Sequence, residues 1–209
     1  ILSLMLNEVR HKYFKKTVQT ILYFPYFISW VVVYSIVYSL TSLDGGMIPQ
    51  LFKMFGQEPI ILLADKGTFR GLLVVTEIWK NAGWGTIIYL AAIAGINDEL
   101  YEAARIDGAG KWAEIRYITL PCIMPTIVTM LLLSMSNVLN AGFAQVLAMY
   151  NPAVYEVADI FDTYVYRQGL LSAQFSYSTA VGLFKSVINF AVVIVFDRIA
   201  KRFGYAGLL

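Results

Sequence analysis

Cysteine, histidine and charged residues are all scarce in this chain of 209 residues. The single cysteine, Cys122, excludes an internal disulfide and a cysteine-based metal site, and the single histidine, His11, argues against a histidine cluster. Charged residues make up 14% of the chain, whereas soluble domains average about 25%. The 16 basic and 14 acidic residues leave a net charge of +2, which offers no basic surface for nucleic acid. We therefore expect neither a metal site nor a nucleic-acid partner.

Apolar residues are abundant instead, at 58% of the chain with a mean hydropathy of +0.64. Soluble domains average about 45–50%. Aromatic residues reach 15%, which excludes a disordered chain. The class of protein that remains is an integral membrane protein.

Four stretches are long and apolar enough to be membrane-spanning helices, which need about 20 mostly apolar residues. They cover about residues 17–40, 71–96, 123–141 and 177–196. The pattern predicts an all-α, polytopic transmembrane bundle that forms a single domain. Pro25 lies inside the first stretch and is expected to kink it or to mark a join. Between the first two stretches, the apolar spacing of Met47–Phe55 predicts a short surface helix.

The first six residues are apolar but too few to span a bilayer. No basic region precedes them and no small-residue cleavage site follows, as a signal peptide requires. We expect them to be the end of a helix that begins outside this chain, so that N-terminal helices are missing.

Basic residues concentrate in three segments that four spans would place on one side of the membrane. Residues 10–16, 105–116 and 198–202 contain four, three and three of the 16 basic residues. Because short cytoplasmic loops carry an excess of lysine and arginine, this side is predicted to be cytoplasmic, including the C-terminus.

The loop between the second and third predicted spans contains a short capped helix. Asn97 or Asp98 is placed to cap its start, and Gly108 to end it in a left-handed turn. Glu102 and Arg105 are three residues apart and are expected to lie on one face. A second amphipathic segment follows, and together the two predict a docking surface in the cytoplasm.

This loop, about residues 97–121, resembles a motif of the inner-membrane permeases of bacterial ABC importers. The motif residues and their spacing all match: Glu102, Ala103 and Ala104, then Gly108, then Ile118, Leu120 and Pro121. Other segments resemble the carbohydrate branch of that family, and within it the permeases for oligosaccharides and polysaccharide fragments; they are residues 7–10, 83–90 and 180–187.

The resemblance implies a transporter subunit with a core of about six helices in the bacterial plasma membrane. Its loop helix would seat in a groove of a cytoplasmic ATPase subunit, with Glu102 and Gly108 most associated with coupling. The implied partners are a second permease subunit, two ATPase subunits, an extracytoplasmic solute-binding protein, a sugar and the lipid bilayer. ATP and Mg²⁺ would be bound by the ATPase subunits.

The chain itself shows no sequence for nucleotide binding or catalysis. Around Gly110 and Lys111, Trp112 stands where a phosphate-binding loop needs Ser or Thr, and Arg105 stands where it needs the first Gly. Cys122 has no base near it in the sequence. We expect no enzyme activity and no cofactor in this chain.

Polar residues inside the predicted spans are candidates for lining the pathway, because charge within a membrane is costly. Lys185 and Asn189 form a polar strip, expected to face the bundle interior near the pathway; a structural tie to another helix is equally open. Asn137 and Asn140 line the pathway or bond to a neighbouring helix.

Two further charges, Glu77 and Lys80, lie in the second predicted span. They are expected to pair with each other or to reach the membrane surface.

Alternatives to a sugar permease remain at this stage. A permease for another solute, such as an amino acid or a metal complex, has the same loop. A secondary transporter driven by an ion gradient is the rival of a different class, and a membrane-embedded enzyme is disfavoured because no catalytic cluster is present.

Overall fold

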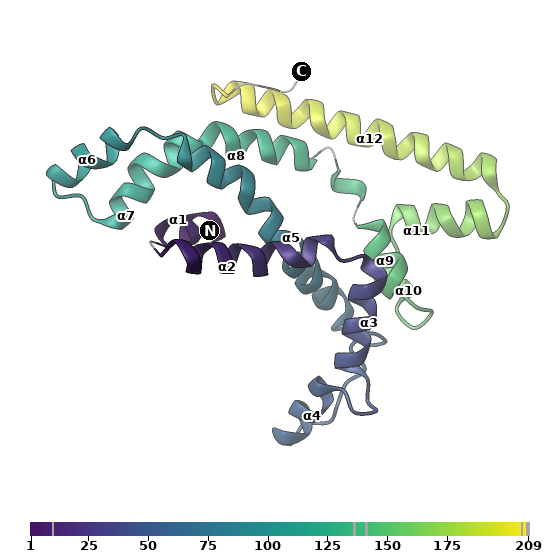
Figure 1. Cartoon of the computed structure of the whole chain (residues 1–209). Coiled ribbons are helices and arrows are strands. Elements are labelled where there is room, and N and C mark those ends of the chain that lie inside the picture. Colours follow the sequence, from purple (N-terminus) through teal and green to yellow (C-terminus); the bar gives the residue numbers. More distant parts are fainter. Residues whose placement is uncertain (10, 136, 141, 206, 208–209) are drawn as a thin grey trace. The chain divides into compact units, whose positions relative to one another are not determined.

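The computed structural model describes residues 1–9, 11–135, 137–140, 142–205 and 207, and all regular elements within them are helical (Figure 1). The predicted all-α fold class is therefore confirmed. The α-helices are α1 Leu2–Glu8, α2 Lys12–Tyr23, α3 Trp30–Thr41, α4 Met47–Met54, α5 Phe69–Ala94, α6 Asp98–Ile106, α7 Lys111–Glu114, α8 Leu120–Met135, α9 Phe143–Met149, α10 Tyr155–Ala158, α11 Phe161–Tyr166 and α12 Phe175–Arg202. Short 3-10 turns (η1 Phe24–Phe27, η3 Val138–Asn140) and π-turns (η2 Ile115–Thr119, η4 Arg167–Leu171) link some of them.

Two helices of the described chain are long and apolar enough to cross a membrane, Lys111–Met135 and Phe175–Arg202. A third span results if the broken pair Lys12–Phe27 and Trp30–Thr41 is taken as one. α5 has the length, with 26 residues, but is not among them, and its charged residues Glu77 and Lys80 lower its apolar content. The four predicted spans thus stay a prediction.

The first predicted span is interrupted rather than continuous, as Pro25 led us to expect. Pro25 lies in the 3-10 turn η1, and Ser29 then caps α3 by accepting a hydrogen bond from the Val32 amide (3.4 Å). At this break, Lys80 donates to two main-chain oxygens, those of Pro25 (3.3 Å) and Tyr26 (2.6 Å). The Pro25 oxygen also accepts a hydrogen bond from the Ile28 amide (3.2 Å). The expected pairing of Lys80 with Glu77 is therefore wrong, and Glu77 accepts a hydrogen bond from the Asn81 amide instead.

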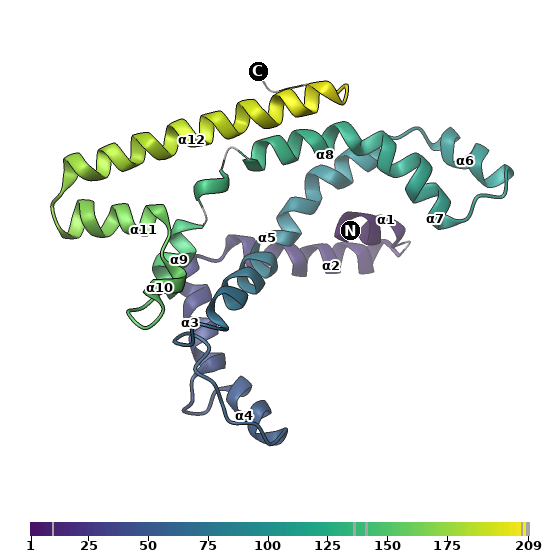
Figure 2. The ribbon, with the colours of Figure 1, turned by 180° about the vertical axis from the view of Figure 1, so that it is seen from behind.

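The chain forms two compact units, each built from separate stretches of sequence. The first comprises Ile1–Tyr23, Ala82–Val138 and Val187–Leu209, and the second Phe24–Asn81 and Leu139–Ser186. In the first unit, α7, η2 and α8 follow one another as a single rod, and α6 lies folded back at its end (Figure 2). α5 meets α2 closely there, because a Cβ at Gly83 would come within 1.9 Å of the Leu22 oxygen. Only glycine permits this approach.

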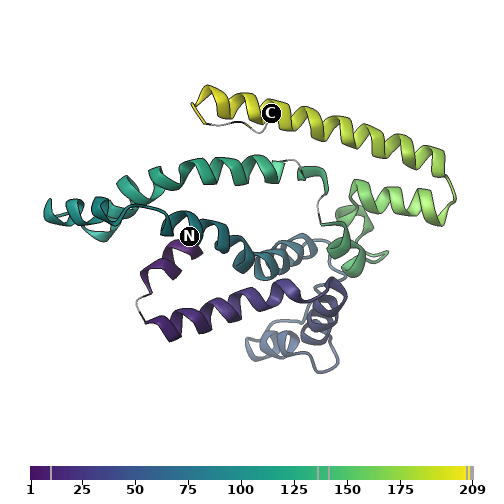
Figure 3. The same ribbon diagram turned by 45° about the horizontal axis from the view of Figure 1, so that its top comes forward.

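The second unit has the main apolar core. Its buried members come from α3, α5, α9, α10 and the connecting segments: Val33, Val37, Leu63, Phe69, Met149, Val154 and Ala158. Gln145 of α9 is buried beside this core and donates to the Leu73 oxygen (2.7 Å) and to Thr76 (2.9 Å), so its polar side chain is satisfied. α11 and η4 run beside the first part of α12 (Figure 3). The surface helix predicted over Met47–Phe55 is confirmed as α4.

The third predicted span ends earlier than expected. α8 stops at Met135 rather than at residue 141, and the Asn137 amide bonds the Ser134 oxygen (3.1 Å) in a tighter turn. Serine and asparagine side chains compete with helical hydrogen bonding, which explains the early end. Asn137 lies in this turn and Asn140 in η3; residues 136 and 141 lie outside the described part.

Candidate functional site

The loop between α5 and α8 holds a nine-residue helix, α6, whose start is capped locally. The Asn97 side-chain oxygen accepts from the Glu99 amide (3.1 Å), and the Asn97 side-chain amide donates to the Glu99 carboxylate (3.0 Å). Asp98 and Glu99 occupy the first turn, where the helix dipole favours negative charge. Asn97, one of two predicted caps, is the cap.

The end of α6 is closed by Gly108, as predicted. Gly108 has φ +80°, and its amide bonds the Arg105 oxygen (3.1 Å) while the Ala109 amide bonds the Ala104 oxygen (2.8 Å). These two bonds form the Schellman motif, which needs a left-handed residue at this position. A Cβ at Gly108 would meet no atom within 4 Å, so the backbone angle alone selects glycine.

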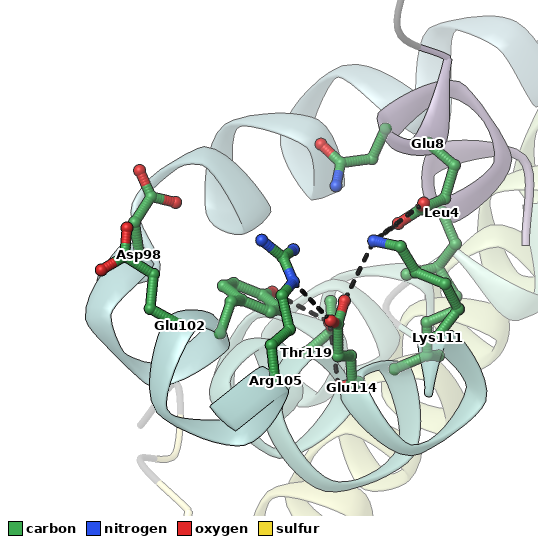
Figure 4. A pocket seen from close by; sticks show the side chains of 11 residues that line it. Leu4, Glu8, Asp98, Glu102, Arg105, Lys111, Glu114 and Thr119 are labelled. Atoms are coloured by element: carbon green, nitrogen blue, oxygen red, sulfur yellow. Dashed lines mark hydrogen bonds and ion pairs between the residues drawn. The ribbon is translucent and has the colours of Figure 1, made fainter. Parts of the chain in front are cut away.

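The outer side of α6 is exposed, and its central acidic residue is Glu102. Glu102 and Ala103 are exposed, and no hydrogen bond or ion pair connects Glu102 to a residue that the structure describes. Figure 4 shows the carboxylates of Asp98 and Glu102 lying away from the bonded network. Ile106 is 87% exposed and Trp112 is 80% exposed on either side of the Gly108 turn. Exposed large apolar residues beside an unpaired acid are typical of a surface that binds another protein.

The inner side of the loop is organised by Glu114, whose side chain is only 5% exposed. Its carboxylate accepts from Arg105 Nε (2.7 Å) and from Lys111 Nζ (3.0 Å) (Figure 4). The hydrogen bond and the charge of Glu114 raise the pKa of Arg105 above its ordinary value. Glu102 and Arg105 line the same cavity, in agreement with their expected common face, and the hydrogen bond of Arg105 goes to Glu114, because the two helices fold back on each other.

Two further bonds complete this inner side. Tyr101 OH and Thr119 Oγ1 lie 2.9 Å apart, and Lys111 Nζ lies 3.2 Å from the carboxylate of Glu8 on α1. A cavity of about 640 Å³ opens between α1, α6 and the start of the α7 rod, lined mainly by these polar side chains.

The remaining motif residues continue the loop into α8. Ala104, Ile118 and Leu120 are half-buried, whereas Gly108 and Pro121 are exposed. Among the described residues, no group of three or more His, Cys, Asp and Glu side chains could hold a metal ion. The loop exposes the apolar side chains of Ile106 and Trp112 and the carboxylate of Glu102.

The candidate pathway residues lie outside this loop. Lys185 forms an ion pair with Asp162 of α11, and their side chains are 12% and 26% exposed. This is the structural tie considered above, and a role in the pathway stays a prediction. Ser186 bonds back to the Gly182 oxygen (3.0 Å), and Asn189 has a buried Oδ1 without a hydrogen-bond partner among the described residues.

Nearly the whole chain is similar to one known protein family. The binding-protein-dependent transport system inner membrane component family matches residues 1–205. The chain belongs to this family. The helical architecture and the apolar helices agree with an inner membrane component of a bacterial transport system.

Two relatives of this inner membrane component come from the same bacterium, and one of them is named as a transport system permease. The polygalacturonan/rhamnogalacturonan transport system permease protein YteP of Bacillus subtilis (strain 168) is 49% identical over 208 residues, and protein LplB of the same organism is 47% identical. Each match covers 100% of this chain and 65% of the relative, so the chain spans about two thirds of their length.

Solved structures agree with the fold of this inner membrane component. One chain in the crystal structure of a bacterial alginate ABC transporter, in complex with an alginate pentasaccharide-bound periplasmic protein, has a TM-score of 0.96 and 40% identity. The match covers 99% of this chain and 72% of that one. A second alginate importer structure gives a TM-score of 0.93 at 40% identity.

Sequence reasoning missed the residues that hold the loop in place. Glu114, Tyr101 and Thr119 lie outside the motif, and only their contacts in the folded loop show their role. The one available signal was Glu114 itself, an acid in an otherwise apolar and basic segment that precedes a predicted span.

Proposed function

We propose that this chain is a transmembrane permease subunit of an ATP-driven importer for a carbohydrate, either an oligosaccharide or a polysaccharide fragment. The observation that carries the proposal is α6: a helix capped at both ends that presents Glu102 and the apolar Ile106 outward. Membership of the family and the name of the polygalacturonan/rhamnogalacturonan permease relative support the solute class. The alginate transporter in complex with its periplasmic protein supports a periplasmic binding protein as one partner.

The proposed mechanism is alternating access. A solute-loaded binding protein docks outside, two ATPase subunits close on ATP and Mg²⁺ inside, and α6 transmits that closure to the spans. A second permease subunit completes the pathway. The apolar stretch of α12 is unburied in this chain and needs lipid or a partner helix, which supports such a contact.

Co-purification from the native membrane tests the assembly. The protein should bring down an ATPase subunit, a second permease and a binding protein, and Glu102→Lys should lose the ATPase while still inserting. Glu58→Lys, an exposed acid outside the loop, is the control and should keep it.

Transport in proteoliposomes tests the solute. Uptake of alginate or polygalacturonan oligosaccharides should need ATP inside and binding protein outside. Uptake that an ionophore abolishes at constant ATP would contradict the proposal and favour a secondary transporter. Uptake of amino acids or metal complexes alone would move the chain to another branch of the family.

A further inference from the structure

The π-turn η2 changes which residues of the α7–α8 rod face α6. Its wide turn is defined by the Leu120 amide bonding the Ile115 oxygen, five residues back. In an ordinary α-helix, residues five apart are rotated by about 140° from each other. In the π-turn, Glu114 and Thr119 lie on the same side, and Thr119 Oγ1 donates to the Glu114 main-chain oxygen (3.3 Å). Such turns within α-helices occur frequently at functional sites.

Two residues of α6, Tyr101 and Arg105, bond Thr119 and Glu114. Tyr101 and Arg105 are four apart and share one helix face. Tyr101 OH lies 2.9 Å from Thr119 Oγ1, and Arg105 Nε lies 2.7 Å from the Glu114 carboxylate. Two bonds, about one helical turn apart on α6, therefore connect α6 to Glu114 and Thr119. The π-turn places these two residues on the same side of the rod.

These two bonds determine the orientation of α6. Every residue of α6 is at least partly exposed, so the helix has little apolar packing to hold it. Its two partners are buried, with Glu114 at 4% and Thr119 at 4% exposure. A buried carboxylate that loses a partner retains its desolvation cost, so the bonded arrangement is strongly preferred.

We propose that η2 and its two bonds to α6 form a rigid joint, through which movement of α6 is carried directly into α8. Tyr101, Glu114 and Thr119 are positioning residues for this step: they act by holding α6 and do not touch the ATPase or the solute. The inference rests on the proposed function. It holds that residues which are not fixed positions of the loop motif link ATPase closure to a membrane span.

The test measures ATP hydrolysed per sugar imported, in proteoliposomes that contain the complete transporter. Tyr101→Phe and Thr119→Val each remove one hydroxyl with almost no change in shape. We expect both to retain the ATPase subunit and its hydrolysis, while the ratio of ATP to sugar rises by about fivefold, as the loss of one hydrogen bond allows. The double variant should show no more than the effect of Thr119→Val alone, since that variant already removes the bond to Tyr101 together with the bond to the Glu114 oxygen.

Two variants serve as controls. Thr119→Ser retains the hydroxyl and should restore the original ratio, which a purely steric role of Thr119 would not require. Tyr117→Phe removes a hydroxyl from the same π-turn, but Tyr117 is 71% exposed, and the ratio should stay unchanged.

The outcomes separate the two proposals. An unchanged ratio in Tyr101→Phe and Thr119→Val, with the unmodified transporter well coupled, overturns the joint and leaves the proposed function standing. A fall in thermal stability without a change in ratio also overturns it and makes the bonds structural only. An unmodified protein that neither binds an ATPase nor imports sugar overturns both.

Discussion

Lys80 of α5 donates a hydrogen bond to the main-chain oxygen of Tyr26 at 2.6 Å and thereby closes the break in the first apolar segment. The same ammonium lies over the rings of Tyr26 and Trp30, at 5.3 Å and 5.5 Å from their centroids. A lysine that is 7% exposed is thus stabilised by carbonyl dipoles and aromatic faces.

The first prediction concerns this lysine. Lys80→Met retains the length but removes the hydrogen bonds that the ammonium donates to the Pro25 and Tyr26 oxygens. We expect the protein in detergent to lose about 1–3 kcal/mol of stability, measured as a lower thermal midpoint. Lys53→Met, at an exposed position of α4, should leave the midpoint unchanged. Equal midpoints for both variants would show that the break is held by packing alone.

The second prediction concerns the turn after α6. Gly108→Val places a β-branched residue at φ +80°, where the strain is well above the glycine-to-alanine difference of about 1 kcal/mol. The turn should rearrange and the ATPase subunit should be lost on co-purification. Gly108→Asn is the matched control at the same position, because asparagine tolerates this conformation, and it should retain most of the binding. If valine is tolerated as well as asparagine, the left-handed turn is not needed.

The third prediction concerns pH. Arg167 bonds Asp159 at 2.8 Å and 2.5 Å and holds the pKa of that carboxyl below its ordinary value. A lowered pKa in the folded state contributes stability above the unfolded pKa of about 3.9, and this stability is lost as the pH falls through the folded value. Asp159→Asn should therefore lower the thermal midpoint at pH 6, and the deficit should shrink below about pH 4.

The matched control for this pair is Asp44→Asn, in the turn before α4. No hydrogen bond or ion pair of Asp44 is present within the described chain. The midpoint of this variant should follow that of the unmodified protein at every pH. A deficit of Asp159→Asn that is constant with pH would mean that the side chain is needed for shape and not for charge.

The fourth prediction concerns topology. Single cysteines at Lys12 and Arg202, in a Cys122→Ser background, should resist an impermeant thiol reagent in intact cells. A cysteine at Lys53 should react, because α4 is predicted to lie outside. All three positions are exposed in the structure, so labelling reports the side of the membrane. The reverse pattern would place α6 on the wrong side for a cytoplasmic ATPase.

Local features of the loop could be read from the sequence. Asn97 caps α6 and Gly108 ends it as predicted, because caps and left-handed turns depend on residues within one helical turn. The charge partners could not be read in the same way. Arg105 bonds Glu114 and not Glu102, since a fold-back of the chain brings a buried acid closer than the exposed one three residues away.

In the apolar segments too, some features could be read from the sequence and others could not. Their composition predicted a helical membrane protein, and Pro25 predicted the break, but α8 ends before Asn137 because a turn there competes with the helix. Lys185 was recognised as needing a partner, and the fold supplied Asp162, which lies 23 residues away in sequence.

The sequence by itself therefore determined the class of the protein, the family and the position of the loop motif, because apolar length, motif spacing and caps are properties of neighbouring residues. Only the tertiary structure decided how that loop is held. The π-turn, the burial of Glu114 and the bond between Tyr101 and Thr119 arise where two helices meet face to face. Which faces meet depends on burial across the whole unit, and that is where residues outside the motif acquire their role.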